Sequence, residues 1–184
     1  GRLPIANPDT RRRPGPVLAS FASLLRERTC HTLPYIAFCG SGAEANEMAL
    51  GIASRIRPGK RRIVAFEGSF HGRTMAVLHA TWNPAKRERF ELNGYEASWC
   101  PWPTCNGHAV PDSPLKLADW DQPKGSEHRP RPDDLDDLEA TEWASLLAVE
   151  RAFETDDAVA IIAEPMQAEG GERHVSDRFF VRLR

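Results

Sequence analysis

Apolar residues along this chain fall into short runs that alternate with longer amphipathic stretches, which is the pattern of an α/β fold. Short apolar runs predict buried strands over residues 35–38, 62–66 and 158–163. Helical spacing predicts helices over residues 17–25, 43–56 and 75–79, and one from Pro132 to about Phe153. The alternation of apolar runs and amphipathic stretches stops at residues 82–132, which are rich in Pro, Gly, Trp and charged residues. This composition predicts a long excursion over the surface.

The start of the helix predicted over residues 43–56 has the features of an anion-binding site. Gly40 and Gly42 permit a tight turn after the first strand, and Ser41 is a favourable N-cap. Apolar side chains then recur at helical spacing, namely Ala45, Met48, Ala49, Ile52 and Ile56. The first-turn N–H groups are free, and the helix macrodipole adds about half a positive charge there. The segment therefore predicts a phosphate cradle formed by the main chain and the Ser41 hydroxyl.

Two other interpretations of this segment stay open on the residues alone. A strand, a glycine turn and a capped helix begin any ordinary βα unit. In addition, Gly40, Gly42 and Ala45 fit the Gly-x-Gly-x-x-Ala form of the dinucleotide fingerprint. Glu67 ends the next strand, where that fingerprint expects a ribose-binding acid. A nicotinamide-dependent dehydrogenase is therefore an alternative function.

Three separated motifs carry a family resemblance. They are Gly-Ser-Gly-Ala-Glu-Ala-Asn-Glu at residues 40–47, Phe-His-Gly-Arg-Thr at 70–74 and Glu-Pro-Met-Gln-Ala-Glu-Gly-Gly at 164–171. In order and spacing they resemble class III aminotransferases, and residues 172–180 are most similar to the 4-aminobutyrate and lysine-6-aminotransferase branches. The resemblance implies pyridoxal 5'-phosphate as cofactor and part of the large domain of a fold-type-I transferase, with a mostly parallel sheet between helices.

The resemblance also implies which residues hold the cofactor. Gly42 and Ala43 are expected to donate backbone N–H groups to its phosphate, with Ser41 close by. Phe70 is expected to stack on the cofactor ring, and His71 to lie beside it. A core aromatic at position 70 and a structural, hydrogen-bonding histidine at position 71 are the alternatives.

Substrate contacts are expected from Arg73 and Glu169. In the family an arginine at the first place holds the substrate carboxylate, which a guanidinium can bind through two parallel hydrogen bonds. A surface ion pair is the alternative for Arg73. Glu169 corresponds to a family glutamate that pairs with a later arginine when one of two substrates is bound. Glu164 is expected to shape the cofactor pocket, since sites of α/β sheets lie at the carboxyl ends of strands.

Some residues that the resemblance implies are missing from the chain. In the family, an aspartate for the pyridine nitrogen and the Schiff-base lysine come later in the sequence. The lysines present lie in turn-like or polar contexts, namely Lys60, Lys86, Lys116 and Lys124. Residues 1–184 are therefore interpreted as a partial cofactor-binding large domain that lacks the small domain and is inactive alone.

The expected parent enzyme transfers an amino group from an ω-amino acid to a 2-oxo acid and, like its family, is a homodimer. A non-catalytic, dimer-forming fragment is a further alternative. With a formal net charge of -2 the chain has no basic field for nucleic acid, and no apolar run approaches the ~18 residues of a membrane span. The cytoplasm is therefore the expected compartment.

Cysteines and tryptophans add two smaller predictions. Free or buried thiols are expected at Cys30, Cys39, Cys100 and Cys105. The spacing of Cys100, Cys105 and His108 is not a standard zinc pattern, so no metal is expected. Packing anchors are expected at Trp82, Trp99, Trp102 and Trp120, with the lining of a substrate channel as the alternative.

Overall fold

Three parallel strands form the sheet in the computed structural model of the chain, which describes residues 15–28, 35–88, 90, 94–103, 137–155 and 157–184. The central strand is β1 (Arg62–Phe66), with β2 (Glu96–Cys100) on one side and β3 (Ala158–Ile161) on the other. The β1–β2 pairing is regular from Arg62↔Glu96 to Phe66↔Cys100, whereas the β1–β3 pairing shifts register after Arg62. The α/β fold with a parallel sheet is thus confirmed.

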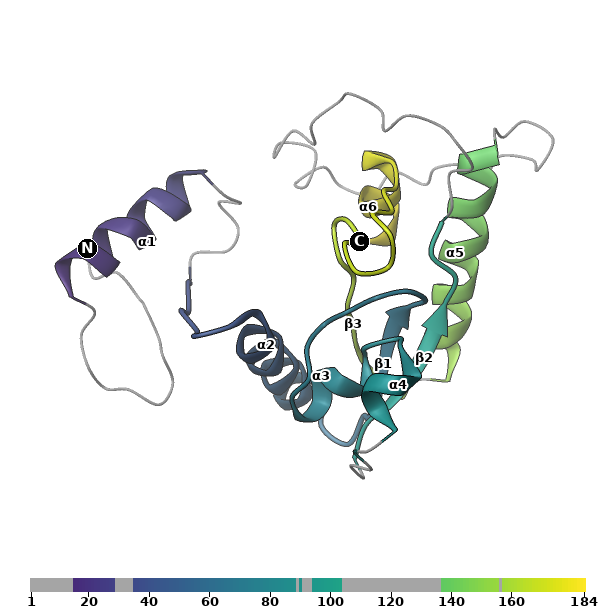
Figure 1. Ribbon diagram of the computed structural model, residues 1–184, viewed down its shortest axis with the longest axis horizontal. Coiled ribbons are helices and arrows are strands. Elements are labelled where there is room, and N and C mark those ends of the chain that lie inside the picture. Colours follow the sequence, from purple (N-terminus) through teal and green to yellow (C-terminus); the bar gives the residue numbers. More distant parts are fainter. Residues whose placement is uncertain (1–14, 29–34, 89, 91–93, 104–136, 156) are drawn as a thin grey trace.

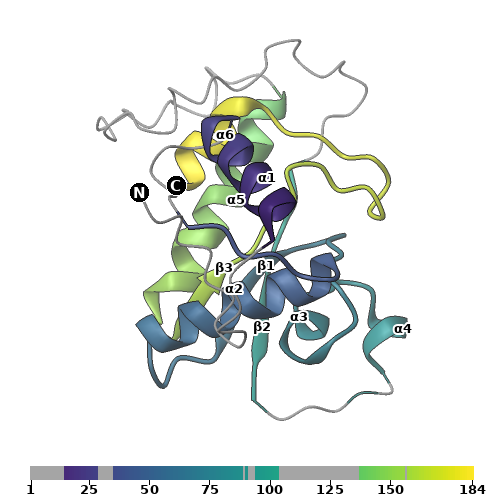
Figure 2. The ribbon, with the colours of Figure 1, turned by 90° about the vertical axis from the view of Figure 1, so that its left-hand side faces the viewer.

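Helices cover both faces of this sheet (Figures 1 and 2). Among the described residues the helices are α1 (Pro16–Arg28), α2 (Gly42–Ile56), α3 (Met75–His79), α4 (Pro84–Arg87), α5 (Asp137–Glu154) and α6 (Asp177–Leu183). Of these, α2, α3, α5 and α6 contribute to the layers on the sheet, whereas α1 lies apart from it in Figure 1. On β1, Ile63 and Ala65 pack with α2 and α3, whereas Val64 and Phe66 pack with α5 and α6. Because helices lie on both sides, β1 is apolar at four successive positions and all four are buried.

The parallel arrangement decides where the motifs meet. The carboxyl ends of parallel strands lie at the same edge of a sheet. At that edge β1 continues into the turn over residues 67–74, and β3 continues into the segment over residues 162–171. A hydrogen bond from Ile162 N to Val64 O, 2.9 Å long, holds the two strands together up to this point. Two motifs that are 90 residues apart in sequence therefore start side by side.

Most predicted elements are confirmed. The strand over residues 62–66 and the helix over 75–79 have the predicted bounds, and α2 begins one residue earlier than expected. β3 ends at Ile161, two residues before the predicted end, and α5 ends at Glu154. The predicted start of that helix at Pro132 lies outside the described residues.

The strand predicted over residues 35–38 is wrong. This segment has no regular secondary structure, and Tyr35 is 70% exposed. A strand needs a hydrogen-bonded neighbour, and within the described residues no strand lies beside this segment. Instead Phe38 packs against Phe21 of α1, with 5.8 Å between the ring centroids.

The apolar stripe assigned to α2 is not its buried face. Leu50 is buried against the sheet together with Ala43 and Ala53, whereas Ile56 is 74% exposed and Ile52 is also exposed. On α1 the predicted stripe is likewise exposed at Val17, Leu18, Phe21 and Leu24. Spacing shows that a helix has an apolar face, but it does not show which face meets the sheet.

The segment over residues 82–132 contains more regular structure than predicted, because α4 and the edge strand β2 lie within it. Trp102 is buried against Phe66 and Phe179, and Trp82 packs on Trp99 with 5.0 Å between ring centroids, so these tryptophans are packing anchors. Trp120 and the rest of the predicted excursion lie outside the described residues.

Cys39 and Cys100 are free thiols, and burial together with the nearby Glu67 carboxylate raises the pKa of Cys100 to about 11. Within the ranges described, no three potential metal-ligating side chains come together, and no helix has the length and apolar character needed to cross a membrane. Cys30, Cys105 and His108 lie outside these ranges.

Candidate functional site

The first turn of α2 is capped by its own side chains. The Ser41 hydroxyl accepts a hydrogen bond from Glu44 N (3.2 Å), which confirms the predicted N-cap. The Glu44 carboxylate accepts from Gly40 N at 2.7 Å, so the pair resembles a capping box. The N–H groups of Gly42 and Ala43 have no acceptor in the described part of the chain. Two backbone donors at a helix N-terminus are therefore available to an anion.

The two glycines are not required by the backbone conformation of this turn. Neither Gly40 nor Gly42 has a positive φ, so the turn itself does not require glycine. A Cβ atom on Gly42 would meet nothing within 4 Å, and one on Gly40 would meet only the flexible Glu44 side chain. The space beside Gly42 is therefore open.

The Phe-His-Gly turn lies directly against this helix end. Asn46 of α2 donates through its Nδ2 to His71 O at 2.8 Å. Gly72, with φ 137°, is required by packing, since a Cβ atom there would lie 2.7 Å from Ala43 Cβ. The structure therefore brings the predicted phosphate cradle and the predicted stacking aromatic together.

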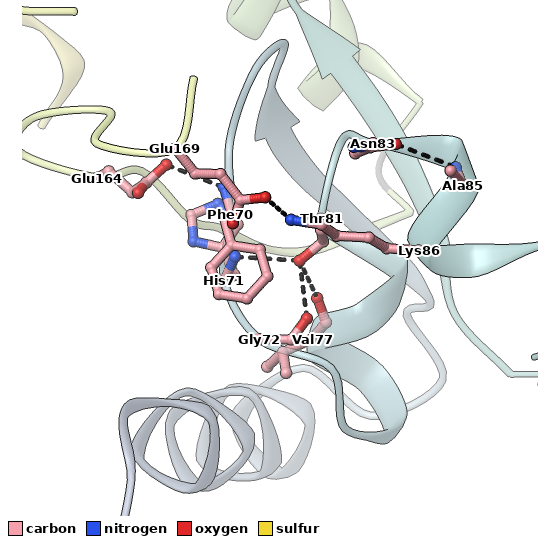
Figure 3. A network of polar contacts seen from close by, with 10 residues as sticks. All are labelled: Phe70, His71, Gly72, Val77, Thr81, Asn83, Ala85, Lys86, Glu164 and Glu169. Atoms are coloured by element: carbon pink, nitrogen blue, oxygen red, sulfur yellow. Dashed lines mark hydrogen bonds and ion pairs between the residues drawn. The ribbon is translucent and has the colours of Figure 1, made fainter. Parts of the chain in front are cut away.

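His71 is buried within this turn (Figure 3). Its backbone N–H donates to Thr81 Oγ1 at 3.1 Å, and the Thr81 hydroxyl donates to Gly72 O at 2.9 Å. The ring Nε2 is buried and has no hydrogen-bond partner among the described residues. Burial lowers the pKa of His71 from 6.5 to about 4, so the imidazole is neutral near pH 7.

Glu164, the first residue of the motif at 164–171, is hydrogen-bonded to the same turn. Its Oε2 accepts a hydrogen bond from Phe70 N at 3.0 Å (Figure 3). Burial raises the pKa of Glu164, and the hydrogen bond from Phe70 opposes this shift. Glu164 therefore lies at the backbone of the predicted stacking residue.

Glu169 has a partner that the sequence did not indicate. Its carboxylate forms an ion pair with the Lys86 ammonium, and Lys86 Nζ lies 4.6 Å from the centroid of the Phe70 ring (Figure 3). The sequence predicts a turn-like or polar context for Lys86, and the structure places it in α4. The Asn83-Pro84 pair before it is a helix-start signal, and α4 does begin there, with Asn83 Oδ1 accepting from Ala85 N at 3.0 Å.

A cavity of about 470 Å³ opens beside this ion pair. Four charged side chains line it, namely Glu67, Lys86, Glu169 and Arg173, together with the aromatic rings of Phe70 and Trp82. The volume lies in the range of about 300–1,000 Å³ that is usual for small-molecule sites. The cavity is therefore large enough for a small charged metabolite.

Gln167 is a second residue that the sequence did not single out. Its side chain is fully buried, and its Nε2 donates to Glu67 O at 2.8 Å. Gly170 passes so close that a Cβ atom on it would lie 2.6 Å from Gly68 O. Close packing therefore requires glycine at position 170. At position 171 glycine is favoured because the backbone has a positive φ of 105°.

Arg73 is exposed, and among the described residues its guanidinium has no partner in a hydrogen bond or ion pair. It follows Gly72 directly and so lies beside the turn. The dinucleotide fingerprint loses support, because the segment before Gly40 is not a strand.

Comparison with known proteins matches residues 18–184 to the family "Aminotransferase class-III". The chain belongs to the class III aminotransferases. Acetylornithine aminotransferase of Methanopyrus kandleri is 32% identical over 166 residues, which are 90% of this chain and 32% of that protein. 2-Aminoadipate transaminase of Pseudomonas putida is 35% identical over 146 residues, covering 78% of this chain and 28% of the relative. The chain thus spans about a third of the length of these relatives.

Solved structures show the same fold. A thermostable (S)-enantioselective omega-transaminase from Thermomicrobium roseum superposes with a TM-score of 0.66 at 21% identity, covering 92% of this chain and 34% of that one. Lysine aminotransferase from M. tuberculosis gives a TM-score of 0.66 at 24% identity, covering 93% of this chain and 37% of the other. The fold of this chain is therefore similar to that of the part of these transaminases that it matches.

The buried His71 predicts how stability depends on pH. Because its pKa is lower in the folded chain, the unfolded chain binds the proton more tightly. Above pH 6.5 His71 is neutral in both states, and the free energy of unfolding is not reduced by its protonation. As the pH falls from 6.5 toward 4, protonation of His71 in the unfolded chain lowers the free energy of unfolding by up to about 3 kcal/mol. Urea unfolding of the wild type and of His71→Gln at pH 7.0, 6.0 and 5.0 measures this loss. Equal pH slopes in the two proteins would contradict it.

Proposed function

We propose that this chain is the cofactor-binding part of a pyridoxal-phosphate-dependent transaminase that moves an amino group from an ω-amino acid to a 2-oxo acid. One observation carries the proposal: the first turn of α2, Phe70 and Glu164 lie together at one edge of the sheet. Family membership supports the reaction class, and the names of the relatives, acetylornithine aminotransferase and 2-aminoadipate transaminase, support amino acid and 2-oxo acid substrates.

The residues present fit the cofactor. Gly42 and Ala43 offer backbone N–H groups without an acceptor in the described chain, and the Ser41 hydroxyl lies beside them. Phe70 is half-buried, so its ring can pack on a flat ligand. When bound, pyridoxal phosphate supplies the electron sink for amino-group transfer. The role of this part of the chain is to anchor the phosphate, orient the ring and exclude water.

His71, Arg73 and Glu169 have distinct roles in this proposal. A neutral His71 can hydrogen-bond beside the ring without adding charge. Arg73 is exposed beside the turn, and its guanidinium can hold a substrate carboxylate through two parallel hydrogen bonds. When the amino donor carries only one carboxylate, Glu169 pairs with the positively charged side chain that would otherwise bind a second substrate carboxylate. A dicarboxylate such as glutamate displaces it.

The parent protein is further proposed to be a cytoplasmic homodimer. The apolar side chains exposed on α1 and α2 support a second subunit, and the free thiols Cys39 and Cys100 support a reducing compartment. Sedimentation of the full-length protein is expected to give twice the subunit mass at micromolar concentration. A monomer under these conditions would contradict the dimer.

The phosphate cradle is tested by Gly42→Val in the full-length enzyme. The structure has open space beside Gly42, so the substitution should leave stability within about 1 kcal/mol. The valine side chain would stand between the backbone and the phosphate, so pyridoxal phosphate affinity should fall by at least about ten-fold. Fluorescence titration measures the affinity.

Gly51→Val is the matched control for this test. Gly51 lies in the same helix, and its added Cβ atom would also meet nothing within 4 Å. Its cofactor affinity should be unchanged. Equal pyridoxal phosphate affinity in Gly42→Val and the parent would show that the phosphate binds elsewhere. Tight binding of a nicotinamide cofactor would support the alternative function of a dehydrogenase.

The role of Glu169 is tested by measuring the two half-reactions separately by stopped-flow absorbance. Glu169→Gln should slow the half-reaction of the ω-amino donor by about ten-fold, if ~1.4 kcal/mol of pairing is lost from the transition state. The glutamate half-reaction should be spared. Arg73→Lys should weaken both, because both substrates use the guanidinium. A Glu169→Gln enzyme that is slow in both half-reactions would leave Glu169 as a structural residue.

A further inference from the structure

Thr81 holds the turn that carries Phe70, although it belongs to none of the three family motifs. Its side chain is fully buried, and its hydroxyl lies between two backbone groups of the turn (Figure 3). Oγ1 accepts a hydrogen bond from His71 N at 3.1 Å and donates one to Gly72 O at 2.9 Å. Val77 O lies farther from Oγ1, at 3.4 Å. One hydroxyl group therefore satisfies both a backbone donor and a backbone acceptor of the turn.

The turn has no substitute for these two bonds. Among the described residues no other group accepts from His71 N or donates to Gly72 O. Strand β1 ends at Phe66, so the pairing of the sheet does not reach the turn. A buried backbone group without a partner is unfavourable, and removal of one partner leaves the other unsatisfied. The conformation of the turn at residues 71 and 72 therefore depends on the Thr81 hydroxyl.

Thr81 has a fixed position because it follows a helix that is packed in the core. In α3 the side chain of Val77 is fully buried and packs with Ile63 and Ala65 of β1. Thr81 N donates to Leu78 O at 3.1 Å, which holds Thr81 at the end of this helix. The turn thus takes its position from α3, and through α3 from the sheet.

The residues on either side of Thr81 bond to the same turn. Ser69 Oγ donates to Ala80 O at 3.1 Å, and Trp82 N donates to Ser69 O at 2.9 Å. Residues 80–82 are therefore joined to residues 69–72 by four hydrogen bonds. Of these four, the two that reach beyond Phe70 both belong to the Thr81 hydroxyl.

Phe70 lies between two peptide groups that are each held by a side chain. Its own N–H donates to Glu164 Oε2 at 3.0 Å, and the next N–H, that of His71, donates to Thr81 Oγ1. Because peptide groups are planar, these two planes set the direction in which the Phe70 side chain leaves the backbone. Without the Thr81 bond, the plane between Phe70 and His71 could rotate, and the aromatic ring would move with it.

We propose that Thr81 is a positioning residue of the cofactor site: its buried hydroxyl fixes the peptide groups that follow Phe70, and so holds the Phe70 ring in the orientation that packs on the cofactor. The proposal rests on the proposed transaminase function, in which this ring contacts pyridoxal phosphate. Thr81 acts through Phe70 and His71. The site therefore requires a hydroxyl group at position 81, whereas the methyl group of threonine contributes packing alone.

The first test compares Thr81→Val and Thr81→Ser in the full-length enzyme without cofactor. Valine keeps the shape of threonine but lacks the hydroxyl, whereas serine keeps the hydroxyl. Amide hydrogen exchange is measured by mass spectrometry in peptides that cover residues 69–73. Exchange should be at least about ten-fold faster in Thr81→Val, and within about two-fold of wild type in Thr81→Ser. Equal exchange in Thr81→Val and wild type would overturn the proposal.

The second test measures the pyridoxal phosphate affinity of the same variants by fluorescence titration. Thr81→Val should weaken binding about ten-fold, and Thr81→Ser should change it by less than about two-fold. A folded Thr81→Ser enzyme that binds the cofactor about ten-fold more weakly would show that the hydroxyl is not sufficient, and would overturn the proposal. This outcome decides the matter even if Thr81→Val does not fold.

Ser145→Ala is the matched control for both tests. Ser145 is also fully buried, and its hydroxyl donates to Pro101 O at 2.6 Å. It lies in α5, which packs on the face of the sheet opposite to α3. Deleting this hydroxyl should leave cofactor affinity and exchange at residues 69–73 unchanged. An equal loss of affinity in Ser145→Ala and Thr81→Val would assign the effect to general destabilisation and contradict a positioning role.

The exchange measurement separates this inference from the proposed function, because it needs neither cofactor nor turnover. Faster exchange in Thr81→Val, in an enzyme whose wild type does not bind pyridoxal phosphate, would count against the proposed function alone. Cofactor binding that is equally tight in wild type and Thr81→Val would count against Thr81 alone.

Discussion

The position of β1 between two layers of helices is the constraint on which the rest of the structure depends. Its four apolar side chains are buried alternately on the two faces, which fixes the strand in its register with β2 and β3. Because all three strands are parallel, the turns that follow β1 and β3 share one edge. The candidate site is built from these two turns and from the end of α2 that packs on the first of them.

Three tight contacts convert that shared edge into a defined site. Gly72 allows α2 to approach the Phe-His-Gly turn, Glu164 accepts from the backbone of Phe70, and Gln167 bonds to the carbonyl of Glu67. Each contact joins segments that are far apart in sequence. The two hydrogen bonds and the close packing at Gly72 together restrict the turns to one arrangement. The backbone around Phe70 is consequently fixed by the chain itself.

Electrostatics distinguishes the two sides of the Phe70 region. On the side of α2, His71 is buried and neutral, and the free backbone N–H groups provide partial positive charge. On the side of α4, full charges meet as the pair of Lys86 and Glu169 beside a cavity with further charged groups. The first environment suits a phosphate and an uncharged ring contact.

The sequence by itself determined the local elements and the family. Residues 62–66 and 75–79 carry enough periodicity to define a strand and a helix, and Ser41 defines the start of α2, because these signals act within a few residues. The motifs around Gly42, Phe70 and Glu164 also indicated the class III aminotransferases without a structure.

Only the tertiary structure decided which faces are buried and which charges pair. Burial of Leu50 instead of Ile52, the lack of a strand at residues 35–38, and the edge position of β2 depend on neighbours distant in sequence. The same holds for Lys86, whose partners Phe70 and Glu169 lie 16 and 83 residues away along the chain. Periodicity reports the local geometry of a helix or strand, whereas burial and ion pairing are set by contacts across the fold.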